Sequence, residues 1–246
     1  MMILITGGTG LVATAQVRYF VAKGHHVVIT YRSDDKLSRF DESDRLTAIK
    51  VPDLLAPDAV LALCAELEAQ NLFPDCLVNC AADTRWHRME HDGHVTEECF
   101  INQYRMNVVV PYELSWRLAT APGSRLKKIV NISSMYGIVP YNPNLYEYPD
   151  NETPLQYGIA KAAMLQLTKE LAIRFRDKGI MVNSVSYGGV EGRASEAFKH
   201  RFAMVTPLKR MMMPEETIPA VDFLLNDESH YMTGQNIIVD GGRTVW

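Results

Sequence analysis

A tyrosine and a lysine four residues apart, Tyr157 and Lys161, form a candidate acid/base pair. The surrounding pattern predicts a helix, on which side chains at this spacing share a face with Cβ atoms about 5–6 Å apart. A phenol has a reference pKa of about 10 and is a poor base at neutral pH. One positive charge about 4 Å away, at an effective dielectric constant of about 20, contributes on the order of 4 kcal/mol. We therefore expect Lys161 to lower the pKa of Tyr157 toward neutral.

Other polar residues stand where predicted strands end, and they argue against a merely half-buried tyrosine beside a solvated lysine. Ser134 follows a strand and can present a hydroxyl at the edge of a sheet, and Asn79 closes another strand. Asp53 follows a third strand, where the amino group of an adenine would be met. Asn107 lies inside a long helical stretch between apolar residues, so a partner or a water must satisfy its amide if it is buried.

A glycine loop, TGGTGLVA at residues 6–13, follows the first predicted strand and opens the first predicted helix. A pyrophosphate needs such a tight turn, with no side chain in its path and helix N–H groups directed at it. Gly7 and Gly10 suit the turn and the close approach, while Ala13 stands where a third glycine is usual. An ordinary tight turn is the alternative, but the position at the start of a βαβ unit favours a nucleotide site.

Arg32 follows the second predicted strand, at the place where an acidic residue would bind the adenosine ribose hydroxyls. A guanidinium instead suits a phosphate, because its planar fork can donate two parallel hydrogen bonds. This favours NADP(H) over NAD(H) as the cofactor. The alternative is a solvated surface arginine, since Asp34 and Asp35 stand close by.

These residues need a scaffold, and short runs rich in isoleucine and valine alternate with helical patterns, as in a parallel sheet wrapped by helices. The predicted strands are residues 3–5, 27–30, 47–51, 76–79, 128–132, 181–185 and 237–239. The predicted helices are residues 11–23, 57–70, 97–120, 155–177 and 214–225. Two irregular stretches, 82–96 and 137–154, follow central strands, at the sheet edge where ligands bind in such folds.

Composition limits the class of protein. The 246 residues, 47% of them hydrophobic and 22% charged, predict one ordinary globular domain spanning residues 1–246. A formal net charge of -4 without a basic stripe argues against nucleic acid as a partner. No apolar run approaches the roughly 20 residues of a membrane span. Four sparse cysteines and a start without a positively charged leader predict a cytoplasmic protein with no signal peptide.

Taken together, these residues resemble the short-chain dehydrogenase/reductase family over essentially the whole chain, including a closing YMTGQ at 231–235 and VDGG at 239–242. The resemblance implies a doubly wound, Rossmann-type α/β fold with a seven-stranded parallel sheet. It implies that Tyr157 exchanges a proton with the substrate oxygen and that Ser134 hydrogen-bonds the same oxygen. Lys161 would also hold the nicotinamide ribose, and Asn107 would anchor a water relay. The implied cofactor contacts are Gly7, Thr9, Gly10, Leu11, Val12, Arg32, Asp53, Leu54, Asn79, Ala81, Ala82, Tyr157, Lys161, Gly188 and Val190.

Departures from the family pattern are informative. The TGGTG spacing and the 23-residue step from Ser134 to Tyr157 are similar to extended members that act on nucleotide sugars. The short chain and the VDGG ending are similar to compact members, which are commonly tetramers, so a homo-oligomer (tetramer or dimer) is expected. Gly192 stands where a threonine often touches the carboxamide, so that contact is not expected. This combination of features is similar to that of dehydrogenases of surface-glycan and flagellin-sugar biosynthesis.

The two irregular stretches predict a small-molecule substrate that is polar and sugar-like, because they carry aromatic faces with amide and guanidinium donors. The candidate substrate contacts are Arg85, Trp86 and Tyr146. The alternative is that these are polar surface loops or subunit contacts.

Three rival interpretations remain open. Residues 87–91 (HRMEH) match a zinc-peptidase pattern, but they fall in a predicted loop rather than on a stable helix, so no metal site is expected. A nucleotide-sugar epimerase or dehydratase would use the cofactor only transiently. A non-catalytic cofactor-binding sensor would have no need of the acid/base pair.

Overall fold

A parallel sheet of seven strands forms the centre of the computed structural model, which describes residues 1–192 and 194–246. The strands are β1 (Met2–Ile5), β2 (His26–Tyr31), β3 (Leu46–Lys50), β4 (Cys76–Asn79), β5 (Lys128–Ser134), β6 (Met181–Tyr187) and β7 (Asn236–Val239). Their order across the sheet is β3-β2-β1-β4-β5-β6-β7. The order reverses between β1 and β4, the position at which open α/β sheets bind their ligands. The doubly wound fold predicted from the sequence is confirmed.

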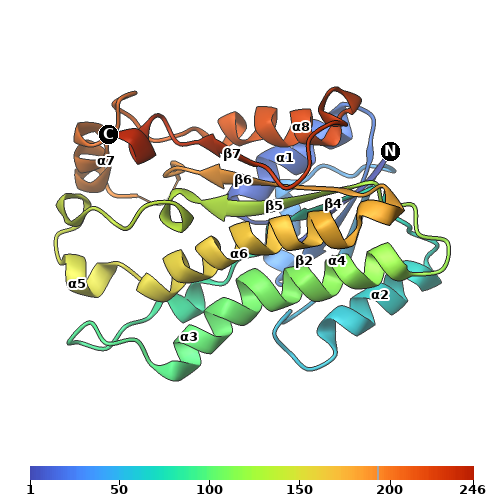
Figure 1. Cartoon of the computed structure of the whole chain (residues 1–246), viewed down its shortest axis with the longest axis horizontal. Helices are drawn as coiled ribbons and strands as arrows, with labels where there is room; N and C mark the ends of the chain where they lie inside the picture. The colour runs from blue at the N-terminus through green and yellow to red at the C-terminus, as the bar shows by residue number, and fades with distance from the viewer. Residues whose placement is uncertain (193) are drawn as a thin grey trace.

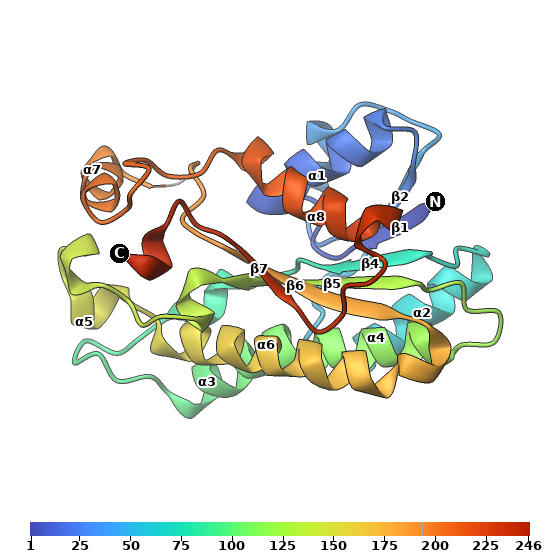
Figure 2. The same cartoon turned by 45° about the horizontal axis from the view of Figure 1, so that its top comes forward.

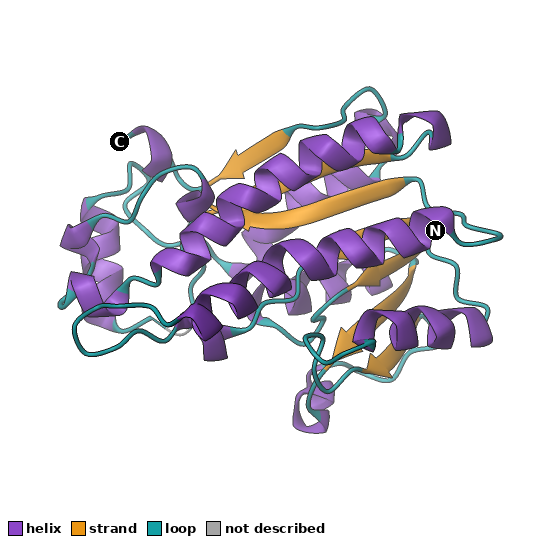
Figure 3. Cartoon of the chain, turned by 60° about the horizontal axis from the view of Figure 1, so that its bottom comes forward, coloured by secondary structure: helices purple, strands orange, loops and turns teal. Residues whose placement is uncertain are grey.

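Helices cover both faces of the sheet (Figures 1 and 2). On one face lie α1 (Leu11–Ala22) and α8 (Ile218–Leu225), and on the other α2 (Ala59–Ala69), α4 (Val110–Thr120) and α6 (Leu155–Arg174). Shorter helices are α3 (Glu97–Tyr104), α5 (Pro149–Glu152) and α7 (Glu196–Met204). Viewed from below, the long helices run side by side across the sheet (Figure 3). No helix among the described residues is long and apolar enough to cross a membrane.

The strands alternate between two hydrophobic cores, as their pleat requires. Leu4 and Val28 point into the core shared with α2, α4 and α6. Ile3, Ile5 and Val27 point into the core shared with α1 and α8. Since both faces are covered, the strands are apolar almost throughout, which is why their sequences are near-continuous hydrophobic runs.

The predicted elements agree with the structure except at three places. The single helix predicted over 97–120 is divided into α3, a π-helical turn at Arg105–Val109, and α4. The helix α7 was not predicted. The stretch 137–154, predicted as irregular, contains the short helix α5. In Figure 1 the loop 82–96, α5 and α7 gather at the end of the sheet that also holds the C-terminus. This is the carboxyl edge of the strands, where the polar residues singled out above are brought together.

Candidate active site

A cavity of about 350 Å³ opens at the carboxyl edge, over the point where the strand order reverses. Its wall combines the glycine loop with the segments that follow β2, β3 and β4. The predicted cofactor residues in this wall are Gly7, Thr9, Gly10, Leu11, Val12, Arg32, Asp53, Leu54, Ala81 and Ala82. Most of the predicted cofactor contacts therefore lie on one surface.

The glycine loop has the geometry that a pyrophosphate requires. Gly7 has a φ of +67°, and a Cβ added to it would lie 2.8 Å from the Cα of Ala81, so no side chain fits there. Its backbone N–H donates to the hydroxyl of Thr30 at 2.9 Å. Gly10 is the N-cap of α1 and offers no side chain, so the N–H groups of the first helical turn remain for an anion. The cradle that a Cβ would fill is the feature that fits a dinucleotide cofactor.

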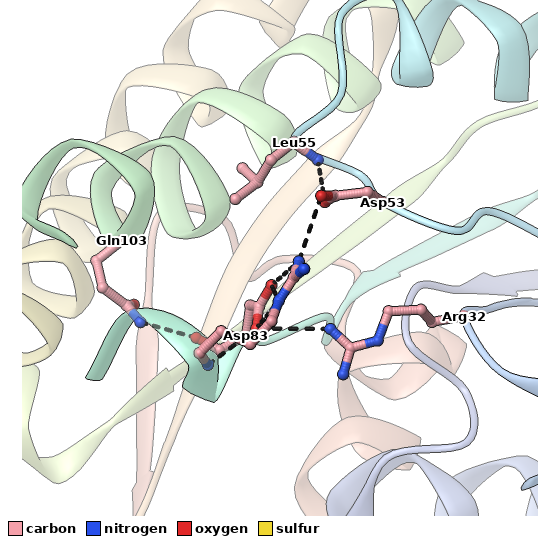
Figure 4. A network of polar contacts seen from close by, with 6 residues as sticks. Arg32, Asp53, Leu55, Asp83 and Gln103 are labelled. Atoms are coloured by element: carbon pink, nitrogen blue, oxygen red, sulfur yellow. Dashed lines mark hydrogen bonds and ion pairs between the residues drawn. The ribbon is translucent and has the colours of Figure 1, made fainter. Parts of the chain in front are cut away.

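We call the part of this cavity around Arg32 and Asp53, where the sequence predicts adenosine contacts, the adenosine end. It carries an ion-pair network centred on Asp83 (Figure 4). Arg85 donates from Nε to both carboxylate oxygens of Asp83, at 3.0 and 2.8 Å, and from Nη2 to Asp53 at 3.3 Å. Nη1 of Arg32 lies 3.6 Å from the same Asp83 carboxylate. Asp83 is only 3% exposed, whereas the two arginines are about half exposed. Two cations and two carboxylates thus share one wall of the cavity.

Asp83 is ionised in this setting. Burial alone would raise the pKa of its carboxyl, but the hydrogen bonds from Arg85 and the charge of Arg32 outweigh burial and hold the pKa of Asp83 below its ordinary value. Asp83 also caps the short 3-10 turn Thr84–His87 by accepting from the backbone N–H of Arg85 at 3.0 Å. The cap directs the Arg85 side chain back toward β3.

β5 and α6 bring together Ser134, Tyr157 and Lys161, three of the residues predicted to be catalytic. Ser134 is the last residue of β5, and Tyr157 and Lys161 lie in the first turns of α6. A Cβ on Gly137 would come within 2.8 Å of the Lys161 carbonyl carbon, so the chain after β5 packs directly on α6. The Ser134 hydroxyl accepts from the backbone N–H of Tyr136 at 3.2 Å, and it lies near enough to the Tyr157 phenol to hold down the pKa of that group.

The electrostatics of the pair correct the expectation that Lys161 lowers the pKa of Tyr157. Burial raises the pKa of Tyr157 above its ordinary value, and the hydrogen bond with Ser134 opposes this rise. The Lys161 ammonium donates to the carbonyl of Ile132 at 2.7 Å and lies 5.7 Å from the centre of the Tyr157 ring. Burial lowers the pKa of Lys161 to about 8. Lys161 is therefore held by the end of β5 rather than by the phenol.

Asn107 sits in the π-helical turn and is almost fully buried. Its Nδ2 donates to the backbone and side-chain oxygens of Gln103, at 2.9 and 2.8 Å. Among the described residues its Oδ1 has no hydrogen-bond partner. Gln103 in turn donates to the carbonyl of Asp83 at 2.9 Å. One chain of hydrogen bonds thus runs from Asn107 to the adenosine end of the cavity.

The ring of His87 packs against that of Tyr157, with the two ring centres 4.9 Å apart. Gln156 holds this loop in place by donating to the carbonyls of Trp86 and Arg88, at 2.9 and 3.2 Å. Burial and the charge of Lys161 lower the pKa of His87 to about 4, so the imidazole is neutral at pH 7. Among the described residues no cluster of histidine, cysteine and acidic side chains could hold a metal ion.

Five predicted cofactor residues lie outside the cavity wall: Tyr157 and Lys161, described above, and Asn79, Gly188 and Val190. Asn79 is 3% exposed, and its Nδ2 donates to Asn131 Oδ1 at 2.8 Å and to the hydroxyl of Ser115. Its side chain therefore joins β4 to β5. Gly188 packs against the backbone of Asp240, where an added Cβ would come within 2.9 Å. Val190 forms an isolated β-bridge with Met212.

The three predicted substrate contacts are separated from one another. Arg85 belongs to the wall of the cofactor cavity, because its cap turns it toward Asp53. Trp86 packs against the core beneath α2 and α4. Tyr146 alone lines a second cavity, of about 360 Å³, that adjoins Gly158 and is mainly apolar. The hydroxyl of Tyr146 is hydrogen-bonded to that of Tyr136. The three residues therefore do not share one surface, and their role as substrate contacts stays a prediction.

Sequence reasoning placed Asp83 and His87 in the loop 82–96 beside the site without giving either a role, and it missed Gln103 and Gln156. The sequence spacing contains a signal for two of these four residues, Asp83 and Gln103. Asp83 stands two residues before Arg85, the spacing of an aspartate that caps a turn, and Gln103 stands one helical turn before Asn107. The roles of His87 and Gln156 depend on the packing of a loop on a helix that is distant in the sequence.

Comparisons with known proteins agree with this geometry. Residues 10–244 match the family model described as enoyl-(acyl carrier protein) reductase. The 3-oxoacyl-[acyl-carrier-protein] reductase of Rickettsia bellii (strain RML369-C) is 28% identical over 245 residues, which cover 97% of this chain and 95% of that protein. The acetoacetyl-CoA reductase of Allochromatium vinosum is 30% identical over 250 residues, covering 97% of this chain and 96% of that protein. A crystal structure of a short chain dehydrogenase from Leptospira borgpetersenii, with bound NAD+, is 30% identical. It superposes with a TM-score of 0.84, over 99% of this chain and 92% of that chain.

Proposed function

Because the chain belongs to the short-chain dehydrogenase/reductase family, we propose that it transfers hydride reversibly between a nicotinamide cofactor and the carbonyl or hydroxyl carbon of a small molecule. The observation that carries this proposal is the placement of Ser134 at the end of β5 and of Tyr157 and Lys161 on α6, at the same sheet edge as the glycine cradle. When bound, the cofactor supplies or accepts the hydride, and the protein positions it. All 246 residues are proposed to act as one such domain.

The residues have distinct tasks in this reaction. In the reducing direction Tyr157 donates a proton to the substrate oxygen, because its raised pKa keeps the phenol protonated at neutral pH. Ser134 donates a hydrogen bond to the same oxygen and stabilises the charge that develops there. Lys161, buried and anchored on Ile132, keeps a positive charge beside the phenolate that remains. Asn107 offers an unpartnered Oδ1 to the water from which Tyr157 is reprotonated.

NADP(H) is the proposed cofactor, in preference to NAD(H). Support comes from Arg32, whose half-exposed guanidinium lines the adenosine end of the cavity. The solved relative from Leptospira borgpetersenii contains NAD+, so the choice depends on residues of this chain. Fluorescence titrations with NADPH and NADH test it: tighter binding of NADPH supports the proposal, and tighter binding of NADH refutes it.

We propose a 3-oxoacyl thioester as the substrate class, in place of the sugar-like substrate expected from the loops. The two curated relatives are, by their names, reductases of 3-oxoacyl-[acyl-carrier-protein] and acetoacetyl-CoA. The cavity beside Gly158 is lined by Ile138, Val139, Leu155 and Ile159, which suit an alkyl chain better than a polyol. The likeness to surface-glycan and flagellin-sugar enzymes stays a prediction.

Absorbance at 340 nm tests the reaction and the substrate together. Stoichiometric oxidation of NADPH with acetoacetyl-CoA supports the proposal. Oxidation of NADPH with sugar aldehydes or keto-sugars alone would still identify an oxidoreductase, but it would favour the sugar-like substrate. Conversion of a nucleotide sugar with no net absorbance change would identify an epimerase or dehydratase, and cofactor binding without any turnover would identify a sensor.

A homo-oligomer, a dimer or a tetramer, is also proposed. Four large side chains form an exposed stripe along α3 and α4 at helical spacing: Ile101, Tyr104, Tyr112 and Trp116. An apolar stripe of this kind marks a protein interface. We further propose a reducing, cytoplasmic location, because all four cysteines are free thiols. Light scattering after gel filtration measures the oligomer, and a monomer at micromolar concentration would refute it.

A further inference from the structure

Arg85 lines the adenosine end of the cavity, although it belongs neither to the glycine loop nor to the segment after β2. We propose that Arg85 is a second phosphate-binding cation of the cofactor site, which together with Arg32 receives the 2′-phosphate of NADP(H), and that Asp83 positions both. The inference deepens the proposed function, on whose nucleotide cavity it rests. It assigns a specificity-determining role to a loop residue after β4.

The guanidiniums of Arg32 and Arg85 both approach the Asp83 carboxylate, and Figure 4 shows Arg32 reaching toward Asp83. Arg32 follows β2 and Arg85 follows β4, strands that flank β1 in the sheet. Arg85 holds Asp83 through bonds of 2.8 and 3.0 Å, and Arg32 approaches the same group to 3.6 Å. Each guanidinium can donate two parallel N–H bonds to a phosphate, and two guanidiniums held close together can bind the same phosphate.

Asp83 holds the arginines without using up their donors. A buried carboxylate is costly unless it is paired, so Asp83 keeps its partners close. A guanidinium has five N–H donors. In Arg85, Nε donates to Asp83 and Nη2 donates to Asp53, so other donors remain for a ligand. Both arginine side chains remain about half exposed toward the cavity. Donors that are already oriented lose less conformational entropy on binding an anion.

A phosphate also changes the balance of charge in this wall. Arg32 and Arg85 are offset there by Asp53 and Asp83, and Lys36 adds a further cation to the cavity wall. A phosphate monoester brings about −1.5 to −2 charges, and it gains from guanidiniums that lie nearer to it than the buried Asp83 does. Removal of either guanidinium takes positive charge away from the wall and weakens its attraction for the phosphate. A cofactor without that phosphate loses less from this change.

Arg88 provides a matched control. The guanidiniums of Arg85 and Arg88 both lie over the Trp86 ring, at 6.0 and 5.7 Å from its centre. Only Arg85 lines the cavity and pairs with carboxylates. A change in net charge or in the packing of Trp86 would affect both arginines alike, whereas a phosphate contact singles out Arg85.

The experiment measures dissociation constants for NADPH and NADH by fluorescence with the wild type, R85A, R85K and R88A. We expect R85A to weaken NADPH about 10- to 100-fold, the worth of a charge-assisted hydrogen bond, and to change NADH by less than about 3-fold. R85K keeps the charge but loses the fork, so its loss lies between those of the wild type and R85A. R88A leaves both constants unchanged.

Each outcome decides one question. Equal losses for NADPH and NADH in R85A would overturn the inference and make Arg85 part of the adenine wall or of the fold. An unchanged NADPH constant would overturn it too. The wild-type ratio of the two constants separately tests the proposed preference for NADP(H). The Arg85 inference depends only on whether R85A, compared with R88A, shifts that ratio toward NADH, so the two failures are distinguishable.

Discussion

At the scale of single residues, the raised pKa of the Tyr157 phenol, which fits the proposed role of proton donor, results from influences that act in opposite directions. Burial raises its pKa, and contact with Ser134 opposes the rise. The Lys161 ammonium, bonded to Ile132, is too buried to move toward water. Lys161 thus contributes a fixed charge whose effect grows when the phenol ionises, since an attraction needs both charges.

Replacing Tyr157 by phenylalanine should abolish turnover and spare the cofactor site. General acid catalysis contributes about 10²- to 10⁴-fold, so kcat should fall by at least about 100-fold. The ring that packs on His87 is retained, so the fold and the NADPH dissociation constant should change little. Steady-state rates at 340 nm and fluorescence titration measure the two effects. A variant with more than half of the wild-type kcat would refute the role given to Tyr157.

The lowered pKa of His87 predicts that the folded protein loses stability in mild acid. Its pKa is lowered to about 4 in the folded chain, against about 6.5 in an unfolded one. Between these values the unfolded chain binds the additional proton, so the free energy of unfolding falls as the pH drops from about 6.5 to about 4. The full contribution is on the order of 3 kcal/mol. Urea denaturation at a series of pH values measures it.

Two variants isolate that contribution. His87→Phe keeps an aromatic ring against Tyr157 and removes the titration, so its stability should decline less between pH 6.5 and 4 than that of the wild type. His91→Phe, at an exposed position of the same loop, should decline in parallel with the wild type. Identical pH profiles for all three proteins would contradict the burial of a neutral imidazole at position 87.

At the scale of elements, the π-helical turn between α3 and α4 links the catalytic and adenosine ends of the site. A π turn contains one extra residue per turn and is frequent at functional sites. Here it contains Asn107, which bonds Gln103, and Gln103 reaches across to the carbonyl of Asp83. The helix and the loop after β4 are thereby fixed to one another.

Replacing Gln103 by alanine should weaken this link. The change leaves the Asp83 carbonyl without that bond and removes one of the two acceptors of Asn107 Nδ2. We expect the free energy of unfolding to fall by about 1–3 kcal/mol and kcat to fall with it. Gln166→Ala, at an exposed position of α6, should stay within about 0.5 kcal/mol of the wild type. Unchanged stability and kcat in the Gln103 variant would refute the link.

The elements also show how far the sequence predicts the fold. The seven strands were found because their buried β-branched runs leave little alternative, and the positions of Ser134 and Asp53 followed from the strand ends. Helix α7 was missed because Phe202 is its only buried residue, so it shows no apolar periodicity. The direction of Arg85 was missed because it is set by the Asp83 cap and by Asp53, which lies 32 residues away. Contacts between distant segments decide such placements.

At the scale of the whole molecule, the two halves of the sheet meet at the reversal between β1 and β4, and the cofactor cavity covers that line. Its wall draws on segments after β1, β2, β3 and β4, whereas the acid/base pair comes from β5 and α6. A ligand that spans both regions connects elements from both halves. Its binding energy is therefore added to the stability of the entire fold.

This arrangement predicts a large thermal shift on cofactor binding. A ligand present at 100 times its dissociation constant stabilises the folded state by about 2.7 kcal/mol. For a chain of this length that corresponds to a rise in Tm of about 5–11 °C. NADPH should produce this shift in the wild type and in Tyr157→Phe alike, because the phenol is not needed to hold the adenosine and pyrophosphate groups. Differential scanning fluorimetry at fixed protein concentration measures the shift. A rise in the wild type that is absent from Tyr157→Phe would mean that the catalytic residues, and not the glycine loop with Arg32, supply most of the affinity.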